Sequence, residues 1–190
     1  MEFRRGFKAE VDRLVTQTRS DLGLSLEDRL DPRALATHLD IEVFELTGLH
    51  AICPDDVAHL TEVDVGAFSG TLLERDGRRA IFVNDAHVAG RQASTIAHEC
   101  AHVMLDHQPS AHFAELGFRV FDAQVEREAD WLAGCLLVPT KAVIPVLRRH
   151  RHDLALCAEH FGVSDQMMGQ RYHRSGAKRI LDRARAKQRV

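Results

Sequence analysis

Residues 88–107 read VAGRQASTIAHECAHVMLDH, and their apolar spacing predicts one amphipathic helix, which we expect Pro109 to end. Inside this stretch, His98, Glu99 and His102 form an HExxH motif. Four residues correspond to about 400° of helical turn, so His98 and His102 project from nearly the same face, about 6 Å apart along the axis. Two imidazoles placed in this way can bind one tetrahedral zinc ion.

Glu99 lies about 100° around the helix from His98, next to the expected position of a zinc-bound water. A carboxylate at that place suits a general base. The opposite side of the helix carries apolar residues that we expect to pack against the protein body: Ile96, Cys100, Val103 and Met104. We interpret Cys100 as a core residue, because its thiol faces away from the metal.

A catalytic zinc ion needs a third protein ligand and an open fourth position. The HExxHxxGxxH pattern is absent, because Leu105 and Gln108 stand where it has its glycine and last histidine. A second helix is predicted over residues 122–137, where Glu126 and Asp130 share one face at i,i+4 spacing. One carboxylate could bind the metal while the other accepts a hydrogen bond from a ligand histidine.

The residues alone leave other third ligands open. His107 or His112 could take the place of Glu126, although His107 also suits a charge at the helix C-terminus. Glu128 points about 200° away from Glu126, so it could reach the ion only if the helix register differed. Trp131 falls at core spacing on the same helix and is expected to pack against the protein body.

A β-hairpin is predicted just before the HExxH helix. Strand-like runs at 67–74 and 78–83 flank Asp76-Gly77, a pair that hairpin turns prefer. Zinc peptidases commonly hold an extended substrate along such a strand edge. We therefore predict substrate contacts at the start of the hairpin, from Phe68, Ser69, Gly70, Thr71 and Leu72.

The remaining segments favour a mainly helical α+β fold with one small antiparallel sheet near the HExxH helix. Asp31-Pro32 has the form of a helix N-cap followed by the first helical residue. Residues 41–46 alternate as a strand, and residues 48–65 fit at most a short helix. Further helices are expected over residues 4–19, 33–39, 140–149 and 176–188, with a helix–turn–helix-like pair over 153–174.

The composition is that of a globular chain that can bury a core: 190 residues, 45% hydrophobic and 28% charged, with a net charge of −3. No apolar run reaches the roughly 18–20 residues that span a bilayer, and the N-terminal MEFRRGFKAE has no apolar stretch after its charges. The four cysteines are far apart and form no CxxC pair. We expect a cytoplasmic protein with reduced thiols and no membrane association.

Basic residues are concentrated at the C-terminus. Residues 171–190 contain eight Lys or Arg and one acid, so the other 170 residues carry −10. This tail directly follows the helix–turn–helix-like pair, a combination that would allow nucleic-acid binding. A solvated helix end is the interpretation we favour. We expect a metallopeptidase domain over residues 1–150, with the helix pair and basic helix of 151–190 packed on the same domain.

The chain resembles the ImmA/IrrE family of gluzincin-type zinc metallopeptidases. The specific parts are VNDAHVAGRQASTIAHECAHVMLDH at 83–107 and EREADWLAGCLLVP at 126–139; the flanks at 31–46 and 154–176 match more weakly. The resemblance implies a zincin-like fold, zinc bound by His98, His102 and Glu126, and Glu99 as the catalytic base. Asp130 falls where the family has an Asp or Asn beside the ligands. The oxyanion-stabilising residue is not identified among His107, His112, Tyr172 and His173.

The same resemblance implies a zinc-dependent endopeptidase that cuts a specific regulator, such as a DNA-bound repressor, under stress or during excision of a mobile element. Such a repressor would be a separate helix–turn–helix protein encoded nearby. Two other functions remain open at this point. One is a DNA-binding regulator, and the other is a zinc-binding sensor of the same fold without catalytic turnover.

Overall fold

The computed structural model describes residues 3–107 and 122–187. The chain forms two compact units. One consists of Asp31–Ala133 and contains the HExxH motif; the other consists of Met1–Leu30 and Gly134–Val190. Helix α5 (Ala123–Leu137) contributes residues to both. The expected domain at 1–150 with the helices of 151–190 packed on it stays a prediction.

The Asp31–Ala133 unit is built on a three-stranded sheet of order β1-β3-β2. Strand β2 pairs antiparallel with β3 through the predicted Asp76-Gly77 turn, whereas β1 pairs parallel with β3. The α+β class is thus confirmed, but the sheet is mixed and not purely antiparallel. A hairpin signal is local, while β1 reaches β3 through a long connection that allows a crossover. The strands are β1 (Ile41–Glu45), β2 (Gly70–Arg75) and β3 (Arg78–Val83).

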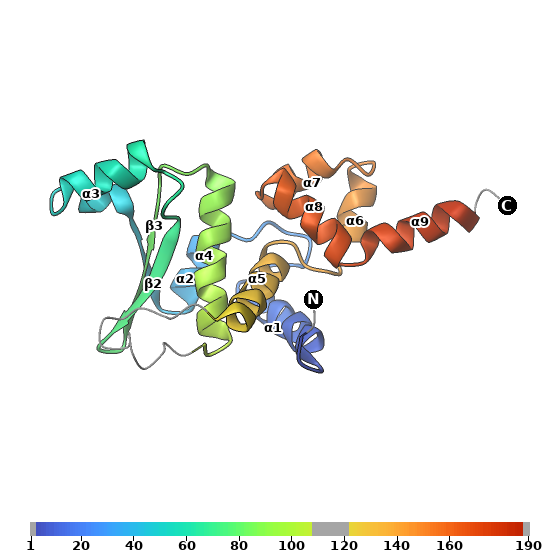
Figure 1. The fold of residues 1–190 in the computed structure, drawn as a ribbon. Coiled ribbons are helices and arrows are strands. Elements are labelled where there is room, and N and C mark those ends of the chain that lie inside the picture. Colours follow the sequence, from blue (N-terminus) through green and yellow to red (C-terminus); the bar gives the residue numbers. More distant parts are fainter. Residues whose placement is uncertain (1–2, 108–121, 188–190) are drawn as a thin grey trace. The chain divides into compact units, whose positions relative to one another are not determined.

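Two helices, α2 (Pro32–His38) and α4 (Ala89–Met104), pack against each other and against the strands (Figure 1). The sheet buries Leu72 and Ile81, which are paired across β2 and β3, and α4 buries Ile96 and Cys100. Asp31 caps α2 by accepting a hydrogen bond from the Arg33 amide, as predicted. The connection between β1 and β2 holds η1 (Leu46–Leu49), α3 (Pro54–Ala58) and η2 (His59–Val63).

Helix α4 ends earlier than predicted, at Met104. The chain closes there by a Schellman-type arrangement: the Asp106 amide donates to the Val103 carbonyl and the His107 amide donates to the His102 carbonyl. Asp106 adopts the left-handed backbone that this closure needs, with φ 53°. Pro109, which we expected to end the helix, lies outside the described residues.

The other unit contains α1 (Phe7–Asp21) and a set of C-terminal helices. Arg19 is fully buried, and its guanidinium donates to backbone carbonyls of Ser25, Asp28 and Leu136, which ties α1 to the end of α5. The predicted helix pair is confirmed, with Gly162 at φ 68° ending the first helix and Ser164 capping the second. The C-terminal helices are α6 (Val143–Arg149), α7 (Leu154–Phe161), α8 (Asp165–Arg174) and α9 (Ala177–Lys187).

Two further observations concern the whole described part of the chain. None of its helices combines the length and apolarity needed to cross a membrane. The cysteine thiols are free, and three of them, Cys100, Cys135 and Cys157, are buried.

Candidate metal centre

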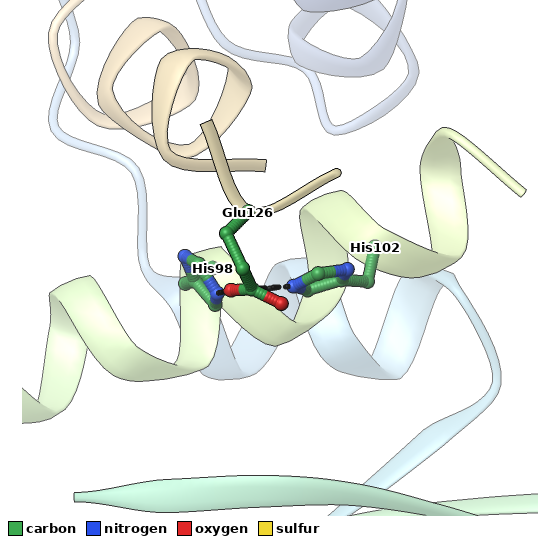
Figure 2. Close-up of side chains that lie close together, drawn as sticks. All are labelled: His98, His102 and Glu126. Carbon is green, nitrogen blue, oxygen red and sulfur yellow. Dashed lines mark hydrogen bonds and ion pairs between the residues drawn. The ribbon is translucent and has the colours of Figure 1, made fainter. Parts of the chain in front are cut away.

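Helices α4 and α5 bring three potential ligand atoms together within the Asp31–Ala133 unit (Figure 2). The Nε2 atoms of His98 and His102 lie 3.0 Å apart. The Oε2 atom of Glu126 lies 3.1 Å from Nε2 of His98 and 3.5 Å from Nε2 of His102. Asp122 caps the start of α5 by accepting from the Gln124 and Val125 amides, which fixes the helix register that points Glu126 at α4.

These separations suit a small tetrahedral cation. Ligand atoms about 2.0–2.2 Å from a tetrahedral zinc ion are roughly 3.3–3.6 Å from one another. The donor set, two imidazole nitrogens and one carboxylate oxygen, is also that of gluzincin-type zinc sites. Within the described residues, this trio is the one cluster of His, Cys, Asp or Glu close enough to hold a metal ion.

Asp130 completes the geometry around His98. Its Oδ1 lies 3.0 Å from Nδ1 of His98, and a carboxylate can only accept a hydrogen bond. With a cation on Nε2, the ring proton of His98 would sit on Nδ1, where Asp130 accepts it, and Nε2 would present its lone pair to the position between the three ligands. The i,i+4 spacing of Glu126 and Asp130 thus brings both acids to the same histidine, as their shared face predicts.

The electrostatic environment of the trio favours a positive charge. Burial by itself lowers the pKa of the His98 imidazole, but the hydrogen bond that His98 donates to Asp130 and the charges of Glu99, Asp130 and Glu126 outweigh it, so the pKa is raised above its ordinary value. A cluster of carboxylates that stabilises a proton at this point also stabilises a divalent cation.

Glu99 lies beside the trio and contacts the sheet. Its side chain is buried, and Oε2 accepts a hydrogen bond of 3.1 Å from the Leu72 amide of β2. Strand β2 is an edge of the sheet, so this bond holds the Glu99 carboxylate against the strand predicted to receive substrate. The sequence predicted Glu99 beside the metal, but it did not predict the contact with Leu72.

Gly70 allows β2 to lie close to α4. A Cβ atom at this position would come 2.5 Å from Cγ2 of Thr95 and 2.8 Å from the Phe82 carbonyl oxygen. Any side chain would therefore push the strand edge away from the helix that carries Glu99. A single glycine in a predicted strand did not indicate that β2 lies this close to α4.

The predicted substrate segment lies where the hairpin begins. Gly70, Thr71 and Leu72 are in β2, while Phe68 and Ser69 precede it. The Phe68 carbonyl accepts a hydrogen bond from Asn84, and the Ser69 hydroxyl accepts one from Arg91 of α4. Substrate binding by these five residues stays a prediction.

The other candidates are placed as follows. Glu128 is buried outside the trio, and His107 contacts the far side of the His102 ring through Nδ1.

Cys100 is a core residue, as predicted, and burial raises the pKa of its thiol to about 12. Trp131 is buried, which confirms its predicted packing. His112 lies outside the described residues, and Tyr172 and His173 belong to the other unit.

These features define a zincin-like, metallopeptidase-like domain. It is an α+β domain whose HExxH helix lies beside an edge strand, and a later helix places an acidic side chain next to the two histidines. The protein-family model for Peptidase M78, the IrrE N-terminal-like domain, matches residues 38–173. The chain therefore belongs to this family, which agrees with the resemblance seen in its motifs.

Comparison with solved structures gives a similar fold in a chain titled Mycobacterium tuberculosis transcriptional regulator, with a TM-score of 0.52 and 17% sequence identity. The similarity covers 84% of this chain and 45% of that one, so the present chain spans less than half of that regulator's length. At this identity the likeness concerns the fold alone. A search of curated proteins gives no match.

Proposed function

We propose that this protein is a zinc-dependent endopeptidase, with His98, His102 and Glu126 as the metal ligands and Glu99 as the catalytic base. The convergence of the three ligand atoms within 4.8 Å of one another is the observation that carries the proposal. When bound, a zinc ion supplies a Lewis acid that polarises the scissile carbonyl and makes water a stronger nucleophile. Glu99 accepts the proton of that water and later delivers it to the leaving amine.

The edge of β2 supplies the groups that would hold an extended substrate. The Asn84 amide donates to the Ser69 carbonyl, so in an antiparallel pair the backbone groups of every second residue from Ser69 point at β3. The groups of Gly70, Leu72 and Glu74 then point outward. The Leu72 amide already donates to Glu99. A substrate strand would therefore pair with the outward-pointing backbone groups on either side of the Leu72 amide, next to the proposed base.

The substrate we propose is a specific regulator protein, namely a helix–turn–helix repressor encoded nearby, and the setting is the cytoplasm. Membership of the IrrE N-terminal-like family and the sequence resemblance support this substrate class. The position of β2 at the edge of the described sheet supports recognition of an extended segment of that protein over recognition of a folded surface.

Metal removal tests the proposal. Purified protein is dialysed against a chelator, divided, and reloaded with zinc or with magnesium. Two substrates are then offered: a quenched-fluorescent peptide library and the purified neighbouring repressor. We expect cleavage of the repressor by the zinc-loaded sample alone, because magnesium prefers an octahedral set of oxygen ligands. Cleavage that survives chelation contradicts a metallopeptidase, and zinc binding without cleavage of either substrate favours the silent sensor.

A second candidate function, duplex DNA binding, is favoured by one surface of the C-terminal unit. Helix α8 exposes four residues at i, i+4, i+7 and i+8 spacing, a set that lies on one helix face: Gln166, Gln170, His173 and Arg174. Glutamine and arginine side chains suit base edges in the major groove. Helix α9 follows with the exposed basic residues Lys178, Arg179 and Arg183, which suit backbone phosphates.

A gel-shift assay with random-sequence duplex at near-physiological salt tests this second function. DNA binding predicts retardation that weakens as salt rises, since phosphate contacts release counterions. The triple replacement of Lys178, Arg179 and Arg183 by glutamate should abolish it, while replacement of the exposed Lys8 and Arg13 of α1 should not. Absence of retardation in the unmodified protein contradicts DNA binding and supports the interpretation of the basic tail as a solvated helix end.

A further inference from the structure

A second acid and a further histidine stand behind the metal-ligand candidate His102. Nδ1 of His107 lies 3.0 Å from Nδ1 of His102. Nε2 of His107 lies 3.8 Å from Oε2 of Glu128, an ion-pair distance, and the two side chains are only 9% and 11% exposed. Glu128, His107 and His102 therefore form a buried row that ends at the metal-ligand position.

The backbone places His107 in this row. The Schellman-type closure of α4 turns the chain back, so that the His107 amide bonds to the carbonyl of His102 itself. Residues five apart in a continuing helix would point to different faces, whereas the left-handed Asp106 brings the His107 ring beside the His102 ring, with centroids 5.1 Å apart. Glu128 reaches the same place from α5.

The two Nδ1 atoms share one hydrogen bond, so one donates and the other accepts. If Nε2 of His102 binds a cation, its ring proton is on Nδ1, and Nδ1 is the donor. His107 must then accept at Nδ1 and carry its own proton on Nε2, which faces the Glu128 carboxylate. The opposite arrangement would place the His107 proton between the rings and leave Nε2 next to a negative charge.

We propose that Glu128 and His107 are positioning residues that hold His102 in the tautomer and orientation that bind a metal through Nε2. This inference rests on the proposed metal site. Three acids of α5 would then act at the site. Glu126 is the ligand, and Asp130 supports His98 directly. Glu128 supports His102 through His107. The two ligand histidines thus receive the same kind of support by different routes.

The zinc dissociation constant, measured by competition with a chromophoric chelator, tests the proposal. His107→Leu removes the acceptor and should raise the constant about 10–100-fold, the usual effect of losing a group that orients a metal ligand. His107→Asn keeps an acceptor near the Nδ1 position and should stay within about 3-fold of the unmodified protein. Glu128→Gln should fall between the two, because the contact with His107 is long.

Thermal unfolding in the presence of chelator separates positioning from folding. We expect His107→Leu and His107→Asn to unfold at similar temperatures without metal while differing in zinc affinity. Unchanged zinc affinity in His107→Leu, with loss of zinc in His98→Ala, overturns the positioning role and leaves the metal site intact. Equal loss of affinity in the Leu and Asn variants also overturns it. If the unmodified protein binds no zinc, the metal site and this inference both fail.

Discussion

Replacement of Glu99 by glutamine is expected to lower the turnover number by about 10²–10⁴-fold, the usual contribution of a general base, while zinc stays bound. Glutamine has the shape of glutamate but cannot take a proton from water at neutral pH. Its side-chain oxygen can still accept the hydrogen bond from the Leu72 amide, so the position of the β2 edge is retained. The change therefore isolates proton transfer from binding and from folding.

Two measurements on the same preparation check this expectation: the rate of cleavage of the neighbouring repressor and the zinc content per chain. Glu62→Gln serves as the matched control, because Glu62 is an exposed glutamate of the same unit. It should leave both quantities unchanged. Turnover by Glu99→Gln at the rate of the unmodified protein would show that another group is the base. Loss of zinc in this variant would instead place Glu99 among the ligands.

The helical parts of the site were predictable from the sequence because they depend on a fixed period. Residues four apart share a face in any α-helix, so HExxH on one helix, and Glu126 with Asp130 on another, define two ligand-bearing faces before any tertiary structure is known. The same arithmetic excluded Glu128 from the trio, in agreement with the structure. The boundaries of α4 and α5 depend on local capping and were predicted to within a few residues.

The parts that escaped prediction depend on contacts between segments that are distant in the sequence or on the chain direction after a helix end. No local pattern states that β1 joins β3 in parallel, or that Gly70 lies against Thr95. His107 was expected at the C-terminus of a helix that in fact closes before it. A five-residue spacing predicts separate faces only while the helix continues, and the left-handed backbone of Asp106 removes that condition.

The last prediction concerns the three proposed ligands. Replacement of His98 or Glu126 by alanine is expected to weaken zinc binding by at least roughly 10²-fold, since four-ligand structural zinc sites bind with about 10–16 kcal/mol and each ligand supplies a share of several kcal/mol. Zinc content after dialysis at fixed free zinc should be near one per chain in the unmodified protein and close to zero in both variants. His50→Ala is the control, because His50 is an exposed histidine of the same unit.

The pattern among these variants identifies the third ligand as well as the site. Loss of zinc in both His98→Ala and Glu126→Ala supports the trio, because the two residues lie on different helices and share little besides the ligand position. Loss of zinc in His98→Ala alone would show that another residue, not Glu126, is the third ligand. The next positions to change would then be those left open by the sequence: Glu128, His107 and His112. Retention of zinc in both variants would contradict the site, because the ion would then bind without two of its three proposed ligands. No other cluster in residues 3–107 and 122–187 has the required geometry.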